Sequence, residues 1–312
     1  MAVSLPPIDR AQPRVYHLDM RRLLCLGLAA TVILSAKTFS GTEALNLTAK
    51  VVAFGPRPAG SANLAKLRTF IKRELAARGS AVVSDTFTGQ TPDGPIQMEN
   101  IIAKFPGKSG RAIAISGHYD TGTESSTGKK MTDFVGANDG GSSTGFLLEL
   151  AAVLQGRPHP DDIYLIFFDG EEAVRSWSDT DSLYGSRHLA EKWSKDGTNA
   201  RLKALINVDM IGDKNFKIVW ETNSAASLRT LVWDAADSLG YKAYFPREGG
   251  PVGDDHMPFL NAGVRALDLI DFESQSSFWH TPQDTMDKLS AHSFEVMGTL
   301  LVKVIGQLEQ QK

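Results

Sequence analysis

Five short pieces of the chain carry the side chains best suited to chemistry. They hold His118 with Asp120, Asp139, Glu171 with Glu172, Asp209, and His280. Imidazoles and carboxylates without a thiolate form a ligand set that suits zinc, and less well manganese or cobalt. The pieces lie far apart in the sequence, so they can form a metal site only if the fold brings them together.

The adjacent Glu171 and Glu172 are the most informative of these residues. Two neighbouring carboxylates repel each other when both are buried in one cleft, and a cation that binds one of them removes most of that repulsion. The other carboxylate is then free to carry protons. Such a pair is usually two solvated surface charges, but this pair closely follows the apolar run 163–168, IYLIFF, which argues against exposure.

Asp139 and His280 each have a plainer interpretation. Asp139 lies in the segment 136–143, GANDGGSS, before an apolar helix, where Asp and Ser commonly serve as caps. The glycines around it favour a close approach of the backbone to another group, which a metal site would explain. A lone histidine in a loop, such as His280, is usually a surface residue. The residues alone leave both interpretations open.

Composition and motifs exclude several other classes of protein. The chain has 312 residues with 42% hydrophobic and 22% charged residues, which are ordinary globular values. A net charge of −3 argues against a nucleic-acid binder. A single cysteine rules out a disulfide framework and a cysteine-based zinc site. The sequence contains no dinucleotide fingerprint of the G-x-G-x-x-G type and no Walker loop.

The N-terminus has the pattern of a targeting segment. Residues 23–34, LLCLGLAATVIL, are almost wholly apolar and follow the pair Arg21-Arg22. A charged region followed by an apolar run of this length is typical of a signal peptide. We expect residues 1–36 to be a cleaved signal peptide or an uncleaved signal anchor, with a buried N-terminal helix as the alternative. The protein is then exported, periplasmic or secreted, and contacts a membrane only through such an anchor.

Two kinds of segment alternate along the rest of the chain and must position the chemical groups. Apolar β-rich runs predict strands at residues 81–86, 100–105, 112–116, 162–168, 205–210, 216–221 and 266–270. Helical periodicity predicts helices at residues 62–78, 143–154, 182–195, 225–239 and 290–309. This alternation predicts a single α/β domain over residues 43–312, with a largely parallel sheet covered by helices on both faces.

The polar pieces fall where such a sheet would place a site. His118 and Asp120 follow the predicted strand that ends at residue 116, and Glu171 and Glu172 follow the one that ends at residue 168. Asp209 lies near the end of the strand 205–210. Ligands of open α/β sheets bind at the carboxyl ends of the strands, so we expect these residues to share one edge of the sheet.

Over about residues 45–310 the chain resembles zinc-dependent aminopeptidases of the bacterial leucyl type. The shared pieces, in order, are GPRPAGS (55–61), GHYDT (117–121), GANDGGSS (136–143), the Glu171-Glu172 pair, NVDMIGD (207–213) and WHTPQDT (279–285). The resemblance implies a single α/β domain around a mixed twisted sheet.

Two further segments resemble more specifically the glutaminyl-peptide cyclotransferases, which share the aminopeptidase fold. They are the passage from Phe168 through Trp177, which continues in residues 181–190, DSLYGSRHLA, and residues 254–260, DDHMPFL. The resemblance implies one zinc ion held by Asp139, Glu172 and His280, and an acid/base at Glu171. It also implies Asp209 and Asp255 in the active-site hydrogen-bond network, and Trp177 and Trp279 as walls of the substrate pocket.

The activity so implied is an acyltransferase reaction. N-terminal glutaminyl residues of peptides or proteins would be cyclised to pyroglutamate with release of ammonia. The alternative enzyme is an aminopeptidase with two zinc ions, in which His118 and Asp209 supply ligands for the second. An alternative of another class is a binding or receptor domain that has kept the fold without catalysis. The residue types at the ligand positions do not separate the two activities.

Overall fold

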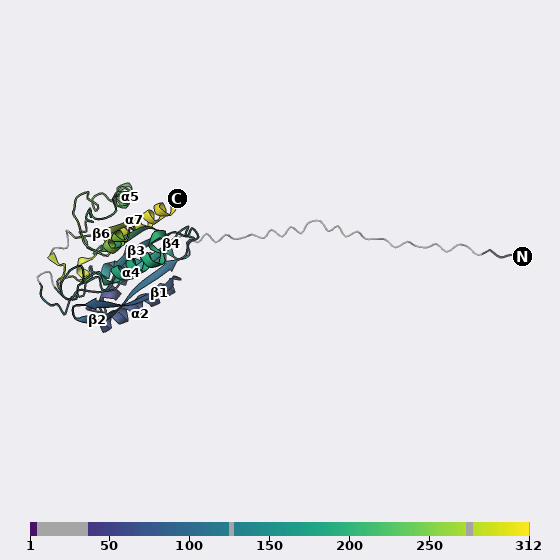
Figure 1. The fold of residues 1–312 in the computed structure, drawn as a ribbon. Coiled ribbons are helices and arrows are strands. Elements are labelled where there is room, and N and C mark those ends of the chain that lie inside the picture. The colour runs from purple at the N-terminus through teal and green to yellow at the C-terminus, as the bar shows by residue number, and fades with distance from the viewer. Residues whose placement is uncertain (5–36, 125–127, 273–276, 312) are drawn as a thin grey trace. The chain divides into compact units, whose positions relative to one another are not determined.

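The structure is a computed structural model that describes residues 1–4, 37–124, 128–272 and 277–311. The chain divides into a unit of residues 1–35 and a compact unit of residues 36–312 (Figure 1). The expected targeting segment, 1–36, lies almost entirely outside the described residues. Across the described ranges, the helices are all too short or too polar to cross a bilayer.

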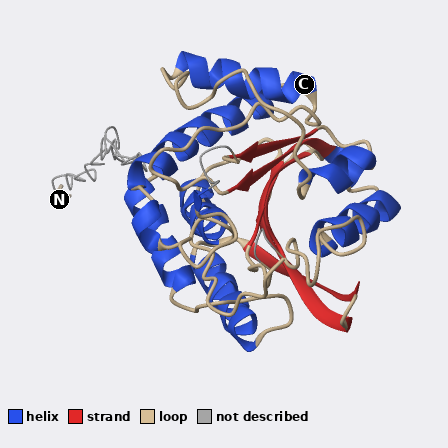
Figure 2. Ribbon diagram, turned by 90° about the vertical axis from the view of Figure 1, so that its left-hand side faces the viewer, coloured by secondary structure: helices blue, strands red, loops and turns tan. Residues whose placement is uncertain are grey.

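The compact unit is built on one six-stranded sheet with the strand order β1-β2-β4-β3-β5-β6 (Figure 2). The strands are β1 (Ala81–Thr91), β2 (Gly94–Phe105), β3 (Ala112–His118), β4 (Asp162–Phe168), β5 (Leu202–Asp209) and β6 (Ala266–Ile270). β3, β4, β5 and β6 are parallel, whereas the β1–β2 hairpin joins the edge of β4 antiparallel. The sheet is therefore mixed and mostly parallel, as predicted.

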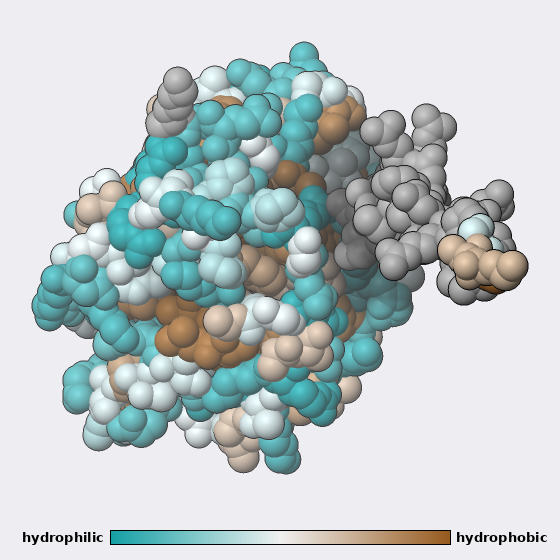
Figure 3. Space-filling view, turned by 90° about the vertical axis from the view of Figure 1, so that its right-hand side faces the viewer, coloured by the Kyte–Doolittle hydropathy of each residue, from teal (hydrophilic) through white to brown (hydrophobic). Residues whose placement is uncertain are grey.

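Helices cover both faces of this sheet (Figure 2). The larger core contains residues of α1 (Gly41–Val52), α2 (Ala62–Ala77), α3 (Gly141–Leu154), α5 (Ala226–Ser238) and α7 (Ala291–Gln310). The smaller core, on the other face, contains residues of α4 (Tyr184–Asp196) and α6 (His256–Asn261). Serine hydroxyls at Ser40, Ser61 and Ser290 cap α1, α2 and α7. The face in Figure 3 is mainly hydrophilic, with hydrophobic residues visible in limited areas.

One predicted strand, residues 216–221, is wrong. The backbone N–H groups of Ile218, Val219 and Trp220 donate to the carbonyls of three separate residues, Tyr244, Ile270 and Glu248. A strand needs a partner in continuous register, and the register here breaks because Ile218 bonds to Tyr244 whereas Trp220, two residues on, bonds to Glu248, four residues on. Its apolar pattern instead reflects burial against the larger core. The sequence-based elements also omitted α1 and α6, and made β1 and β2 too short to form their hairpin.

The buried parallel strands bring the chemical groups to one edge of the sheet. β3, β4 and β6 are buried along their whole length, and β5 nearly so. His118 is the last residue of β3 and pairs with Phe168, the last residue of β4. Asp209 is the last residue of β5. Because these strands are parallel, the turns that follow them meet at the same edge.

Candidate functional site

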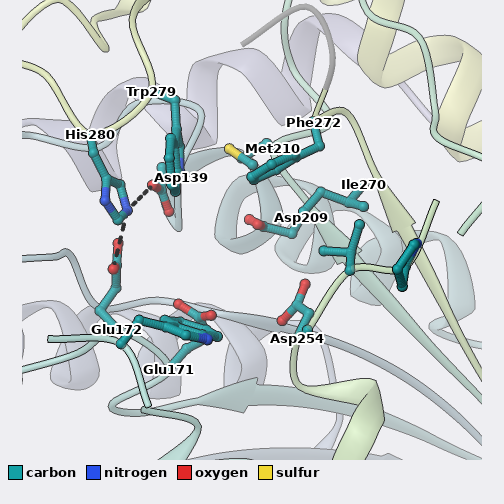
Figure 4. Close-up of a pocket in the computed structure, with 14 residues that line it drawn as sticks. Asp139, Glu171, Glu172, Asp209, Met210, Asp254, Ile270, Phe272, Trp279 and His280 are labelled. Carbon is teal, nitrogen blue, oxygen red and sulfur yellow. Dashed lines mark ion pairs between the residues drawn. The ribbon is translucent and has the colours of Figure 1, made fainter. Parts of the chain in front are cut away.

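Three ligand-type side chains from distant segments converge at this edge (Figure 4). His280 Nε2 lies 3.4 Å from Asp139 Oδ2 and 3.3 Å from Glu172 Oε2. A tetrahedral zinc ion with bonds near 2.0–2.1 Å would hold neighbouring ligand atoms about 3.3 Å apart. Asp139 Oδ2 and Glu172 Oε1 are buried and accept no hydrogen bond from any described residue. A cation would satisfy both oxygens, so these side chains fit a divalent metal.

A second group of the same kind shares Asp139. His118 Nε2 lies 3.1 Å from Asp139 Oδ1 and 3.1 Å from Asp209 Oδ1. The two oxygens of Asp139 therefore face two different histidines. The structure brings together both the three expected ligands and the two additional ligands of the aminopeptidase alternative.

The charges at the site are balanced within the protein itself. Burial disfavours the protonated form of His280, but Glu172 and Asp139 outweigh it and raise the pKa of His280 to about 11. Burial likewise opposes protonation of His118, but Glu171 and Asp209 raise its pKa well above the usual value. Without a metal ion, the positive charges of protonated His280 and His118 offset the negative charges of the carboxylates. A bound metal cation would supply this positive charge instead.

Glu171 lies beside the first group without being part of it. It is 7% exposed, it lines the same pocket, and its Oε2 lies 3.8 Å from His118 Nδ1. Burial raises its pKa well above the usual value, and the neighbouring Glu172 and Asp254 raise it further, although His118 opposes them. A buried carboxyl group in this setting can take up a proton and return it.

Asp120 fixes the backbone of the glutamate pair. Its Oδ1 accepts the N–H of Glu171 at 3.2 Å, and its Oδ2 accepts the N–H of Glu172 at 3.3 Å. His118 Nδ1 also lies 3.5 Å from Asp120 Oδ1. One carboxylate therefore holds the turns after β3 and β4 together. The sequence places Asp120 among the candidate chemical residues. In the structure its carboxylate holds the backbone of Glu171 and Glu172.

Asp284 and Arg57 are supports that the sequence did not single out. Asp284 accepts the N–H groups of Asn138 at 2.8 Å and Asp139 at 3.0 Å, which ties the loop of His280 to the loop of Asp139. Arg57 is fully buried, and its guanidinium donates to the backbone carbonyls of Tyr119 and Gly136. Burial lowers the pKa of Arg57 to about 10, so it remains a cation at neutral pH.

The backbone adopts rare conformations close to these groups. Among the described non-glycine residues, only Leu183, Met210 and His280 have a positive φ, of 52°, 50° and 50°. Such conformations are costly and concentrate at functional sites. Gly140 has a φ of 74°, and a side chain there would meet the carbonyl of Asp120 at 2.4 Å. The close approach expected around Asp139 is therefore present.

A pocket of about 400 Å³ opens over the first ligand group (Figure 4). Its walls are mainly apolar and include Trp177, Trp279, Met210, Ile270 and Phe272. The Trp279 ring stacks on the imidazole of His280, with the ring centroids 4.2 Å apart. Trp177 is 48% exposed, so it is a wall of the pocket mouth rather than a core residue.

The structure places one expected residue differently. Asp255 is fully buried and does not line the pocket, whereas its neighbour Asp254 does. Asp254 Oδ2 accepts a hydrogen bond of 3.0 Å from Asn207 Nδ2, and Asp254 shares the wall with Asp209. The two aspartates are adjacent at the start of α6, so only the local turn decides which one faces the cavity.

Ser143 has the spacing of a serine nucleophile but not its environment. Residues 141–145 read GSSTG, which matches a G-x-S-x-G elbow. The Ser143 hydroxyl is fully buried in the first turn of α3 and donates to the backbone carbonyl of His118 at 2.7 Å. Ser143 therefore holds α3 against the end of β3.

Comparisons with known proteins agree with this geometry. Residues 100–305 match the model of peptidase family M28. A glutaminyl-peptide cyclotransferase of Drosophila melanogaster is 32% identical over 257 residues, which cover 73% of this chain and 70% of the relative.

Solved structures show the same likeness. The crystal structure of an Acidobacteriales bacterium glutaminyl cyclase has a TM-score of 0.82 and 41% identity, and covers 91% of this chain and 99% of that one. A Bacteroides thetaiotaomicron glutaminyl cyclase bound to N-acetylhistamine has a TM-score of 0.79 and 26% identity, over 89% of this chain and 100% of that one.

Proposed function

The chain belongs to peptidase family M28, and from that membership we propose that it cyclises N-terminal glutaminyl residues of peptides and proteins to pyroglutamate. Ammonia is the second product. The observation that carries the proposal is Glu171, a buried carboxyl group beside the three ligand-type side chains in a small apolar pocket. The names of the relatives support the same reaction.

We propose zinc as the cofactor, held by Asp139, Glu172 and His280. Two carboxylates and one imidazole without a thiolate suit this ion, and their ligand atoms all lie within 4.8 Å of one another. When bound, the ion would polarise the side-chain carbonyl of the substrate and stabilise the negative charge that develops on its oxygen.

Glu171 transfers the proton in this mechanism. The free α-amine of the substrate attacks its own side-chain carbonyl carbon, so a C–N bond forms and closes a five-membered ring. Glu171 accepts a proton from the amine and returns one to the departing amide nitrogen, whose bond to carbon breaks. The reaction consumes no water. Both reacting groups belong to one residue, so the pocket has mainly to hold the reactive rotamer.

Asp209 and Asp254 complete the acidic wall that faces Glu171. Burial raises the pKa of Asp209 to about 7 and also raises that of Asp254. Carboxyl groups whose pKa is raised hold a proton more readily, and a protonated carboxyl group can donate a hydrogen bond within this wall as the proton moves. Trp279 packs on His280 and lines that side of the pocket.

We also propose that residues 1–36 direct export of the protein. The support is the charged pair Arg21-Arg22 before the apolar run 23–34. Expression of the full chain, followed by fractionation and N-terminal sequencing of the recovered protein, tests this proposal. Recovery of the intact chain from the cytoplasm alone would contradict it.

The function is tested by incubating zinc-loaded protein with a peptide that begins with glutamine. We expect ammonia release and a mass loss of one ammonia, and we expect a chelator to abolish both. A peptide with an acetylated N-terminus is the matched control, because its amine cannot attack. No ammonia from the zinc-loaded protein would end the cyclase proposal.

An aminopeptidase is the second candidate, and one observation favours it. His118, Asp139 and Asp209 have the spacing of a second metal site. The same incubation separates the candidates, because a peptidase would release free amino acids from many peptides. Elemental analysis then counts the bound metal, with one ion expected for the cyclase and two for the peptidase.

A further inference from the structure

The segment of residues 170–184 is a closed loop that carries Trp177 to the pocket. The backbone N–H groups of Leu183 and Tyr184 donate to the carbonyls of Glu171 and Gly170, each at 2.8 Å, and these bonds close its base. Trp177 lies near the middle of the loop with 48% of its surface exposed. Packing of the ring alone therefore does not explain its position.

Asp181 fills the interior of this loop. It is 3% exposed, and its carboxylate accepts the backbone N–H groups of Val174, Arg175 and Ser176, each at 2.9 Å. The Tyr184 hydroxyl donates a fourth hydrogen bond at 2.8 Å. Burial opposes ionisation of Asp181, but the backbone N–H donors outweigh it and lower its pKa. At neutral pH the group is an anion that only accepts hydrogen bonds.

The loop has further links, and one of them is an exposed ion pair. Arg175 pairs with Asp93, but these side chains are 64% and 52% exposed, and exposed pairs contribute little to stability. The Thr123 hydroxyl donates to the carbonyl of Val174 at 3.0 Å. Asp181 is therefore the buried anchor of the backbone that leads directly into Trp177.

We propose that Asp181 is a positioning residue that fixes Trp177 as a wall of the substrate pocket and thereby sets the affinity for the glutaminyl residue. This inference rests on the proposed function. Trp177 lines the main pocket and also two neighbouring cavities, so a shift of this ring would open the main pocket sideways. Asp181 touches none of the reacting atoms and acts only through the loop.

The decisive variant is Asp181→Asn, alone and combined with Trp177→Ala. An asparagine side chain has one acceptor oxygen, and its amide N–H₂ would face backbone donors, so about half of the hydrogen bonds are lost. We expect KM to rise about 10- to 100-fold, with kcat changed by less than about threefold. Hydrogen exchange at the amides of residues 174–176 should become faster, while the bound metal stays the same.

The double variant separates positioning through Trp177 from general destabilisation. In the Trp177→Ala background, Asp181→Asn should raise KM by less than about twofold, because its effect passes through a ring that is already gone. Asp93→Asn is the matched control on the exposed side of the loop, and it should leave KM within about twofold. Equal effects of Asp181→Asn in both backgrounds, or loss of the metal, would overturn the inference.

A binding measurement keeps this test apart from the test of the activity. N-acetylhistamine is the ligand of the similar Bacteroides thetaiotaomicron glutaminyl cyclase structure. Calorimetry with this compound should show weaker binding by Asp181→Asn and unchanged binding by Asp93→Asn. If Asp181→Asn binds the compound more weakly but the wild type releases no ammonia, the proposed function is refuted. The inference that Asp181 positions Trp177 would still stand. Unchanged binding and unchanged KM would refute the inference alone.

Discussion

The two sides of Asp139 differ although their ligand atoms are spaced alike. On one side, Oδ2 faces His280, whose side chain is 16% exposed at the pocket. On the other side, Oδ1 faces His118, whose side chain is fully buried at the end of β3 and does not line the pocket. Among the described residues, Asp139 Oδ2 and Glu172 Oε1 on the His280 side accept no hydrogen bond, whereas on the other side Asp209 Oδ1 and Asp139 Oδ1 each lie 3.1 Å from His118 Nε2.

This difference suggests separate tasks for the two histidines. A substrate entering the pocket reaches His280, Glu172 and Glu171, whereas His118 lies behind them. The carboxylates around His118 raise its pKa well above the usual value, against the effect of burial, so it carries a positive charge of its own. A protonated His118 can hold Asp139 in place without a second metal ion. The spacing of ligand atoms alone therefore does not determine how many metal ions the site binds.

The largest expected effect comes from the His280 side. Removal of the metal with a chelator, or the variant His280→Ala, should lower the turnover of a glutaminyl peptide by at least about 10³-fold, because the main electrostatic stabilisation is lost. Elemental analysis should find no bound metal in the variant. Full activity after complete metal removal would show that this side is not the reactive one.

Glu171→Gln tests the proton carrier between the two sides. The amide keeps the shape of the side chain but cannot accept the proton of the amine, so kcat should fall by about 10²- to 10⁴-fold. The bound metal should not change, because Glu171 belongs to neither ligand group. Steady-state kinetics with elemental analysis measures both. A variant with wild-type kcat would remove Glu171 from the mechanism.

His118→Gln tests whether the buried side holds a second metal. If His118 only compensates charge, the variant keeps one metal ion and loses about 10- to 100-fold in kcat/KM. Its melting temperature should fall, because the substitution leaves buried carboxylates without a cation. Calorimetric melting and metal analysis check the two parts. Loss of one of two metal ions, together with all activity, would favour the aminopeptidase.

The smallest effect is a pH dependence of the metal-free protein. Burial raises the pKa values of Asp209 and Asp284 to about 7. The folded chain then binds these protons more tightly than the unfolded chain. The resulting stability is present below about pH 4 and is lost as the pH rises through about 7. The melting temperature should fall by at least about 4 °C between pH 5 and pH 8.

Zinc and one matched variant show which side of Asp139 causes this loss. Asp209→Asn should reduce the fall in melting temperature, because it removes a titrating group from the His118 side. Zinc bound only between Asp139, Glu172 and His280 should leave the contribution of Asp209 in place, whereas a second ion beside Asp209 would remove that contribution. Equal melting temperatures of the metal-free protein at pH 5 and pH 8 would contradict the raised pKa values of Asp209 and Asp284.

The sequence predicted the frame well where the pattern was strong. The continuous apolar run of β4 predicted a strand buried on both faces, and the polar residues after β3, β4 and β5 were expected at one edge of the sheet. The sequence predicted secondary structure less well where an apolar pattern can mean either a strand or a buried irregular segment. Residues 216–221 are apolar because they are buried, and nothing local shows that no neighbouring strand accompanies them.

The sequence by itself determined the chemical groups and the strand ends that carry them, because residue type and apolar periodicity are local properties. Only the tertiary structure decided that Asp254, rather than Asp255, faces the pocket, and that Asp139 stands between two histidines. It also decided that Asp284 and Arg57 fix the loop of Asp139 by hydrogen bonds to its backbone. The choice between Asp254 and Asp255 depends on a local turn whose direction residue type does not show. The other facts depend on contacts between segments far apart in the sequence, such as Asp139 and Asp284, and a linear pattern contains no distance across space.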